Sequence, residues 1–299
     1  MKKLEKPSFR ECTKLFMIVF TIIILSPVTT TADDNTSLLY RVSGNGLEQP
    51  SWIYGTIHMI CAEDFFISDA VSEALKSSQK MVMELDMSDP QMMQKMQGLA
   101  MHPEMKNISD FMKPEDAEAF NNYLTSRFGA GLEHIGMMKP FVIASMLVMT
   151  QINCDRVESY ENYFLTYAIQ NGINIKGLET IEFQAGLFDN IPYELQVKEL
   201  VAMINDPEKG LAEFEQLVHC YKNQDINCLY EAIKESDSYI RDFEEILLTE
   251  RNKNWVPLLE KIMTEHQSFI AVGAGHLPGA KGLLYLLKEA GYTIEAIKE

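Results

Sequence analysis

Short apolar segments lie near the two ends and in the middle of the chain, and this pattern predicts β-strands there. They are "LLYRVSG" (38–44), "SWIYGTIH" (51–58), "KMVMELD" (80–86), "INIKGLET" (173–180), "SFIAVGAGH" (268–276) and "YTIEAI" (292–297). The turn-forming stretch "GNGLEQP" separates the first two segments, which therefore form a predicted hairpin.

Between these strands, apolar residues recur at helical spacing through two long regions, about 88–170 and 181–266. Shorter helices are expected at 68–78 and 279–291. Strands separated by helices indicate an α/β fold, so we expect one central mixed sheet with two long helical insertions. We expect residues 33–299 to form a single domain.

The N-terminal segment does not belong to this fold. Five basic residues precede the apolar run "LFMIVFTIIIL", and the small-residue stretch "TTTA" follows it. This order is typical of a secretory signal peptide, here residues 1–32 with cleavage after Ala32. The apolar run is shorter than the ~20 residues of a membrane-spanning helix. We therefore expect a periplasmic or secreted protein, or a membrane-anchored one if the signal is not cleaved, without a later membrane span.

The composition of the chain limits the classes of partner that it is expected to bind. Without residues 1–32, 21 basic and 41 acidic residues remain, so the net charge is −20. Such an acidic chain is not expected to bind nucleic acid or an anionic membrane. Four cysteines remain, which permits disulfides in an exported protein. Cys220 and Cys228 flank a polar turn and are the favoured pair, whereas pairing of Cys61 with Cys154 is left open.

One arrangement occurs twice, a strand followed by a glycine turn with the spacing G-x-x-H. Gly55 precedes His58 in "YGTIHM", and Gly273 precedes His276 in "VGAGHL", where Gly275 is a further motif glycine. Either histidine alone could simply cap or pack against the fold. The repeated context favours function, because two related half-sheets would bring the two histidines face to face at the carboxyl ends of strands.

Two glutamates also lie at predicted strand ends, Glu84 in "VMELD" and Glu179 in "GLET". A carboxylate there needs a partner, so each could form a salt bridge at the rim of the sheet. Together with His58 and His276, however, they form a ligand set suited to a divalent ion, such as Zn, Fe, Ni or Mn. An ion of this kind activates water, and hydrolysis is then the expected reaction class.

Arg251 and Asn252 precede the last histidine strand on a predicted helix. They could hold a substrate or stabilise an oxyanion, or Arg251 could pair with nearby glutamates. The segment 87–112 contains seven methionines, which could bind copper(I) or form an adaptable apolar surface. The other histidines, at 102, 134, 219 and 266, are expected to be surface residues.

Read in order, these motifs resemble the TraB/PrgY/GumN family, which is related to the animal Tiki proteins, and they are most similar to its GumN-like exported bacterial branch. The motifs that carry the resemblance are "YGTIHM", "VMELD", "MKPFVIA" (138–144), "IKGLETIEFQ", "LLTERNKNW" and "IAVGAGHLPGAKGLL". Many GumN-like members have Gly-Val-Asp where this chain has "SYENYF" (159–164), and Gly-Asp where it has Gln224-Asp225. Neither difference is expected to touch the site.

The resemblance implies a fold like that of erythromycin esterase and the haem-uptake ChaN-like proteins, and a Mn- or Co-dependent peptidase activity. Carried onto this chain, it implies that His58, His276, Glu84 and Glu179 bind the ion, with catalytic roles for Glu84, Glu179, Arg251 and Asn252. We therefore expect an exported metal-dependent hydrolase that acts on a peptide or small-molecule substrate. The alternative is a non-catalytic protein that binds a peptide, haem or copper. The substrate and oligomeric state are not predicted.

Overall fold

The structure is a computed structural model that describes residues 36–235 and 242–298, so the predicted signal peptide lies outside the described residues. The described residues form one compact unit. Its strands are β1 (Leu39–Gly44), β2 (Ser51–Thr56), β3 (Ile60–Cys61), β4 (Lys80–Leu85), β5 (Val157–Glu158), β6 (Asn174–Glu179), β7 (Ser268–Gly273) and β8 (Tyr292–Ile297).

The α-helices are α1 (Asp69–Ser77), α2 (Met92–Ala100), α3 (Pro114–Phe128), α4 (Leu132–Ile135), α5 (Pro140–Gln151), α6 (Tyr160–Gln170), α7 (Ile181–Leu187), α8 (Tyr193–Asn205), α9 (Pro207–Lys222), α10 (Ile226–Glu235), α11 (Glu250–Glu265) and α12 (Leu283–Glu289). Short 3-10 turns are η1 (Ile108–Phe111), η2 (Phe188–Asn190) and η4 (Ala274–His276), and η3 (Glu245–Thr249) is a π-helical turn.

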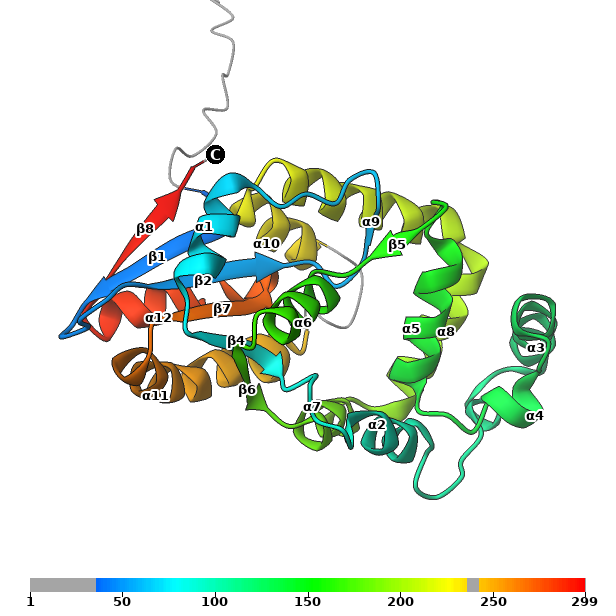
Figure 1. Cartoon of the computed structure of the whole chain (residues 1–299). Coiled ribbons are helices and arrows are strands. Elements are labelled where there is room, and N and C mark those ends of the chain that lie inside the picture. The colour runs from blue at the N-terminus through cyan, green and yellow to red at the C-terminus, as the bar shows by residue number, and fades with distance from the viewer. Residues whose placement is uncertain (1–35, 236–241, 299) are drawn as a thin grey trace, which may run out of the picture. The chain divides into compact units, whose positions relative to one another are not determined.

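Six strands form one mixed sheet in the order β6-β4-β7-β2-β1-β8 (Figure 1). The first four strands are parallel, and β1 pairs in the antiparallel sense with β2 and β8. Helices α2 to α6 lie between β4 and β6 in the chain, and α7 to α11 lie between β6 and β7. The predicted α/β fold with a central mixed sheet and helical insertions is therefore confirmed.

The two strands that carry the G-x-x-H motifs are direct neighbours. Strand β2 pairs in parallel with β7, with Thr56 opposite Gly273. The two motifs thus follow adjacent strand ends in one continuous sheet. Since β4 and β6 continue the parallel part of the sheet on the other side of β7, four carboxyl ends lie along the same edge.

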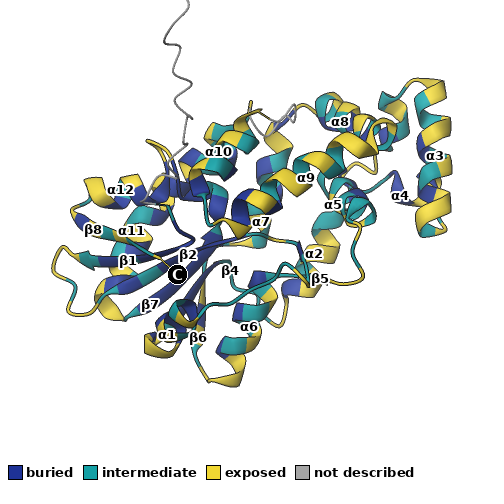
Figure 2. Ribbon diagram, turned by 90° about the horizontal axis from the view of Figure 1, so that it is seen from above, coloured by how far each residue is buried: buried dark blue, intermediate teal, exposed yellow. Residues whose placement is uncertain are grey.

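The parallel strands form the main core because their side chains are covered by helices on both faces (Figure 2). Ile53, Val82 and Ile270, one from each of three neighbouring strands, have no exposed surface. Trp255 from α11 is equally buried. This packing fixes the positions of the strands and hence of the turns that follow them.

The first helical insertion and α8 share a separate core, formed around Phe120, Leu124, Ile143 and Leu147. Helix α3 begins at Pro114, a favourable first position, and its C-terminal cap is glycine in the left-handed region, with a φ of 72°. Among the described residues, no helix combines the length and apolar character that a membrane span requires.

A second sheet of two short strands was not predicted. Strand β3 pairs with β5 in the antiparallel sense, with Ile60 opposite Glu158. A disulfide joins Cys61 of β3 to Cys154, which precedes β5. A second disulfide joins Cys220 to Cys228, across the turn between α9 and α10. The first disulfide links the segment after His58 to the segment that leads through β5 into α6.

Candidate active site

The predicted site residues lie at the carboxyl ends of the four parallel strands. Glu179 is the last residue of β6, Glu84 is the last residue but one of β4, and His58 and His276 follow β2 and β7. Arg251 and Asn252 enter from the first turn of α11. The structure therefore brings together the residues that the sequence singled out. Most of them form a buried network around Arg251, whereas the side chain of His58 is exposed.

Arg251 is the centre of the buried part of the site. The residue is only 8% exposed. Its Nη2 donates to Glu84 Oε2 at 2.6 Å and to Glu179 Oε2 at 2.8 Å, and its Nε lies 3.1 Å from both oxygens of Glu179. Its Nη1 donates to the Leu247 carbonyl at 2.9 Å. A buried guanidinium requires this degree of pairing, and its planar fork suits two carboxylates.

Both oxygens of Glu179 are already used by groups of the chain. Besides Arg251, the indole of Trp255 donates to Oε1 at 2.9 Å, and the side-chain amide of Gln184 donates to Oε2 at 3.0 Å. The Arg251 guanidinium also lies over the Trp255 ring, 4.9 Å from its centroid. Glu179 is thus placed to hold Arg251, and its side chain is only 6% exposed.

Glu84 has a similar set of partners but is more open, with 14% of its side chain exposed. Its Oε1 accepts from the Gly273 N–H at 2.8 Å, and its Oε2 accepts from Gln184 at 3.1 Å as well as from Arg251. Burial raises the pKa of the Glu84 carboxyl, but the positive charges of His276, which is protonated only at acidic pH, of Arg251 and of His58 outweigh burial and lower the pKa to about 2. Glu84 is therefore ionised at neutral pH.

His276 is held in one orientation by Asn252. The Asn252 amide nitrogen donates to two carbonyl oxygens, those of His276 at 3.2 Å and Lys281 at 3.0 Å, so its Oδ1 must face the imidazole. Because Oδ1 lies 2.7 Å from His276 Nδ1, that nitrogen carries the proton. Nε2 then accepts from Arg251 Nη1 at 3.1 Å. Asn252 thus selects the tautomer with a lone pair on Nε2.

The surroundings of His276 keep the ring neutral. It is 3% exposed and lies against Trp255, with the ring centroids 4.4 Å apart. Burial lowers the pKa of His276 to about 3, and the positive charge of Arg251 acts in the same direction. The lone pair on Nε2 is therefore retained at neutral pH.

His58 lies in different surroundings, since 70% of its side chain is exposed. Its Nδ1 lies 2.9 Å from Glu161 Oε1. This hydrogen bond raises the pKa of His58 above its usual value near 6.5, although water screens the pair at such exposure. Because Nδ1 donates to the carboxylate, Nε2 is the ring nitrogen left for a substrate.

Glu161 was missed by the sequence analysis. It lies in the first turn of α6, where Thr56 Oγ1 donates to its Oε1 at 2.7 Å and Ser159 Oγ donates to its Oε2 at 2.9 Å. It belongs to "SYENYF", the segment expected not to touch the site, and that expectation was wrong. No local sequence pattern signals this contact, because His58 and Glu161 are 103 residues apart in the chain.

The motif glycines let the two turns approach each other. A Cβ at Gly55 would lie 2.9 Å from Leu277 Cδ1 and 3.0 Å from Ala274 Cβ, both in the turn of the other motif. A Cβ at Gly273 would lie 3.2 Å from Glu84 Oε1. A side chain at Gly275 would meet Ile233 Cδ1 at 3.1 Å. These glycines are therefore explained by contacts within the protein.

The four predicted ligands do not fit a common metal ion as they are arranged. Arg251 bonds both glutamates, and the oxygens of Glu179 are shared among three donors. Among the residues that the structure describes, no three His, Cys, Asp or Glu side chains are grouped to hold one ion.

The comparisons with known proteins show a family. The model of the TraB/PrgY/gumN family matches residues 38–296, which include both strand-end turns, α11 and the helical insertions. No curated protein and no solved structure matches the chain. The match covers most of the sequence and every residue of the site, and the chain therefore belongs to the TraB/PrgY/gumN family.

Proposed function

We propose that this chain is a hydrolase that acts on peptides and that the strand-end cluster is its active site. The observation that carries the proposal is the contrast between two histidines at adjacent strand ends. Each has Nδ1 held by an oxygen acceptor, yet their pKa values are shifted in opposite directions. Groups whose pKa values are moved apart in one site are suited to separate acid and base roles.

In this proposal, His58 transfers protons at the open side of the site. Its raised pKa keeps Nε2 protonated near neutral pH, so His58 can deliver a proton to the departing amine. Glu161 orients the ring and stabilises the imidazolium, as a carboxylate does for histidine in hydrolytic triads. The hydrogen bonds from Thr56 and Ser159 hold Glu161 in place.

The buried residues supply a fixed electrostatic environment. The Glu84 carboxylate is the accessible acceptor that can orient an attacking water and take up its proton, which returns to solvent after His58 has protonated the departing amine. The Arg251 charge favours negative charge that develops on the substrate carbonyl oxygen, in a site where the arginine is already paired and immobile. Glu179 and Asn252 act as positioning residues, for Arg251 and His276 respectively.

A peptide-library assay tests this proposal. We expect cleavage by the wild-type protein, and losses of at least about a hundredfold in His58→Ala and about tenfold in Glu161→Gln, the range typical of acid–base groups. His219→Ala is the matched control, because the His219 ring is hydrogen-bonded to Asn223 at the same helix end and, within the described parts of the chain, to no residue of the site. Absence of cleavage, or cleavage by His58→Ala at the wild-type rate, contradicts the proposal.

Dependence on a divalent ion, Mn or Co from the family resemblance and Zn from ligand chemistry, is a separate proposal. Neutral His276 and ionised Glu84 are chemically suitable ligands, but Arg251 contacts both. Metal analysis of protein purified without chelator tests it, together with the cleavage assay before and after chelation. One equivalent of ion whose removal abolishes cleavage supports metal dependence, whereas full activity in the metal-free protein excludes it.

The alternative is a protein that binds a peptide, haem or copper without turnover. Exposed thioethers favour this alternative, because Met93 and Met96 on α2 and Met105 after it are 66%, 44% and 54% exposed. Copper(I) titration of the wild type and of a Met93→Leu, Met96→Leu double variant distinguishes the two. Tight binding that the double variant loses, in a protein that cleaves no peptide, supports the alternative.

Export also belongs to this proposal, with the mature chain in the periplasm or outside the cell. We expect the N-terminal sequence of protein from the producing cell to begin at Asp33, after cleavage behind Ala32. A protein that retains Met1 and stays in the membrane fraction would be anchored by its signal segment. A protein that retains Met1 and remains in the cytoplasm would contradict export.

A further inference from the structure

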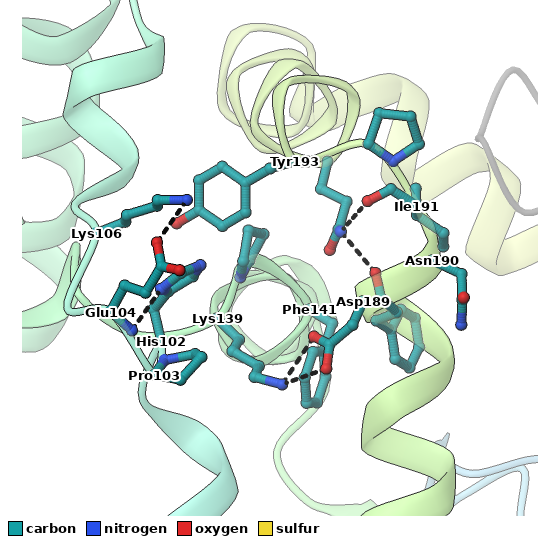
Figure 3. A pocket seen from close by; sticks show the side chains of 14 residues that line it. His102, Pro103, Glu104, Lys106, Lys139, Phe141, Asp189, Asn190, Ile191 and Tyr193 are labelled. Atoms are coloured by element: carbon teal, nitrogen blue, oxygen red, sulfur yellow. Dashed lines mark hydrogen bonds and ion pairs between the residues drawn. The ribbon is translucent and has the colours of Figure 1, made fainter.

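A pocket lies at the base of the helical insertions. It has a volume of about 450 Å³, within the usual range for small-ligand sites. Its walls come from the segment after α2, the start of α5, the turn η2 and the start of α8, as Figure 3 shows with His102, Phe141 and Tyr193. The start of α5 belongs to "MKPFVIA", a motif that the strand-end site does not use.

Two buried polar atoms in the lining have no hydrogen-bond partner within the described parts of the chain, Gln196 Oε1 and Tyr193 Oη. Gln196 is 5% exposed, and its Nε2 donates to the carbonyls of Phe188 and Ile191, both at 2.9 Å. The orientation of the amide is thus fixed, and Oε1 is left as an acceptor. Burying unpaired polar atoms is unfavourable, which points to a ligand that pairs with them.

The Tyr193 hydroxyl complements this acceptor as a donor. Burial raises the pKa of Tyr193 to about 12, so the hydroxyl keeps its proton over the physiological range. Tyr193 and Gln196 are three residues apart on α8 and therefore project from neighbouring positions on the helix. The lining thus offers one acceptor and one donor.

The charged residues of the pocket are already paired. Lys139, only 8% exposed, donates to both oxygens of Asp189 at 2.8 and 3.0 Å, and Lys106 pairs with Glu104 at 2.8 Å (Figure 3). The pairs balance, so the lining as a whole favours a neutral ligand over an ion.

The remaining walls are apolar. Phe141 stacks on Phe188 with the ring centroids 4.6 Å apart and the planes 13° from parallel. Pro103, Pro140 and Pro192 complete this part of the lining. A flat or aliphatic side chain next to a neutral polar group would match these surfaces.

We propose that this pocket binds a peptide segment through one backbone amide. The amide N–H donates to Gln196 Oε1, its carbonyl accepts from the Tyr193 hydroxyl, and a neighbouring apolar side chain packs against Phe141. An amide is the neutral group that presents one donor and one acceptor in this way.

Helix α7 connects this pocket to the strand-end site. Gln184 donates to Glu84 and Glu179, and Phe188, four residues later, lines the pocket. Four residues correspond to about 6 Å along a helix. The pocket is therefore a subsite for the same peptide, an inference that rests on the proposed peptidase function for its role but not for its binding chemistry.

Ligand-observed NMR titration tests the pocket without relying on turnover. The probe is N-acetyl-phenylalanine N-methylamide, and the matched probe is the diester in which oxygen replaces both amide N–H groups. We expect the wild type to bind the amide with a Kd in the millimolar range and the diester about fivefold more weakly, since one hydrogen bond is lost.

Tyr193→Phe should weaken binding of the amide about fivefold without lowering the unfolding midpoint, because the hydroxyl has no hydrogen-bond partner among the described residues. Tyr123→Phe is the matched control, since its hydroxyl contacts Thr150 Oγ1 at 2.9 Å outside the pocket, and it should leave binding unchanged. These results support the proposal.

Three results would overturn the proposal for the pocket: equal binding of the amide and the diester, wild-type affinity in Tyr193→Phe, or no binding up to tens of millimolar. The two polar atoms would then be hydrogen-bonded by water alone. The two proposals fail separately, because peptide cleavage can be found with no probe binding, and probe binding can be found with no cleavage.

Discussion

The two G-x-x-H turns have the same sequence pattern and follow adjacent strands, yet they hold their histidines in opposite ways. His276 is 3% exposed and is fixed by Asn252 and Arg251 within a buried ion network. His58 has a side chain that is 70% exposed and a single carboxylate partner, Glu161. The comparison teaches that a repeated motif fixes where the backbone turns, while the protonation of its histidine depends on residues from other elements.

The largest expected effect comes from removing Arg251, the cation of α11 that contacts the buried turn. Arg251→Met leaves two buried carboxylates without their main partner, and we expect the free energy of unfolding to fall by about 3–5 kcal/mol. Chemical denaturation measures this. Arg156→Met is the matched control, because Arg156 forms an exposed pair with Glu158 and should change stability by less than about 0.5 kcal/mol. Equal losses of stability in both variants would contradict the difference between the buried network and an exposed ion pair.

The exposed turn depends instead on a covalent link. The Cys61–Cys154 disulfide closes a separation of 93 residues and joins β3, just after His58, to the segment before Glu161. Replacing both cysteines by alanine should lower stability by about 4.6 kcal/mol in the chain-entropy model, against about 2–3 kcal/mol for Cys220 and Cys228, which are 8 residues apart.

Denaturation of both double variants and cleavage assays of the folded proteins check this prediction. Loss of the first disulfide should also reduce cleavage, because it loosens His58 relative to Glu161. A variant without Cys61 and Cys154 that retains wild-type stability and cleavage would show that the disulfide does not support the exposed turn.

A smaller effect is expected where the two turns touch. Gly55→Ala places a methyl group 2.9–3.0 Å from Leu277 and Ala274, and we expect a loss of about 1–3 kcal/mol in stability. At Gly186 of α7 an added Cβ meets nothing within 4 Å, so Gly186→Ala should be neutral or gain up to about 1 kcal/mol. Thermal unfolding of the two variants measures both changes in stability. Similar losses of stability would mean that the two turns are not in close contact.

The smallest effect on stability is expected at Glu161. Glu161→Gln removes an ion pair with an exposed histidine, so the loss should be below about 1 kcal/mol. Because the folded-state pKa of His58 is raised, the pair stabilises the fold fully below pH 6.5 and loses this contribution as pH rises through the folded pKa. The difference between wild type and variant should therefore shrink above neutral pH, and a difference that grows with pH would contradict the pairing.

The sequence predicted the sheet, the helical insertions and the strand-end positions of His58, Glu84, Glu179 and His276, because periodicity and glycine turns are local signals. It did not predict the β3–β5 pair, since two-residue strands have no periodicity of their own. Glu161 was missed because its contact with His58 joins residues 103 apart in the chain. The sequence also could not predict that both carboxylate oxygens of Glu179 already accept hydrogen bonds, since this depends on how α7 and α11 pack against β6.

The difference between the histidines also gives opposite signs in the pH dependence of stability. The folded-state pKa of His276 is lowered, so below pH 6.5 the unfolded chain takes up a proton that the folded chain does not. His276 therefore reduces stability progressively as pH falls from 6.5 towards 3, by an amount on the order of a few kcal/mol. His276→Gln should remove this part of the pH dependence.

The most direct test of the contrast is an NMR titration of the imidazole ¹⁵N signals of His58 and His276, assigned with single His→Gln variants. We predict that His276 stays neutral with its proton on Nδ1 down to about pH 3, and that His58 titrates with a midpoint above 6.5. If both rings titrate together near pH 6.5, the two turns do not differ in the way the buried network and the exposed pair require.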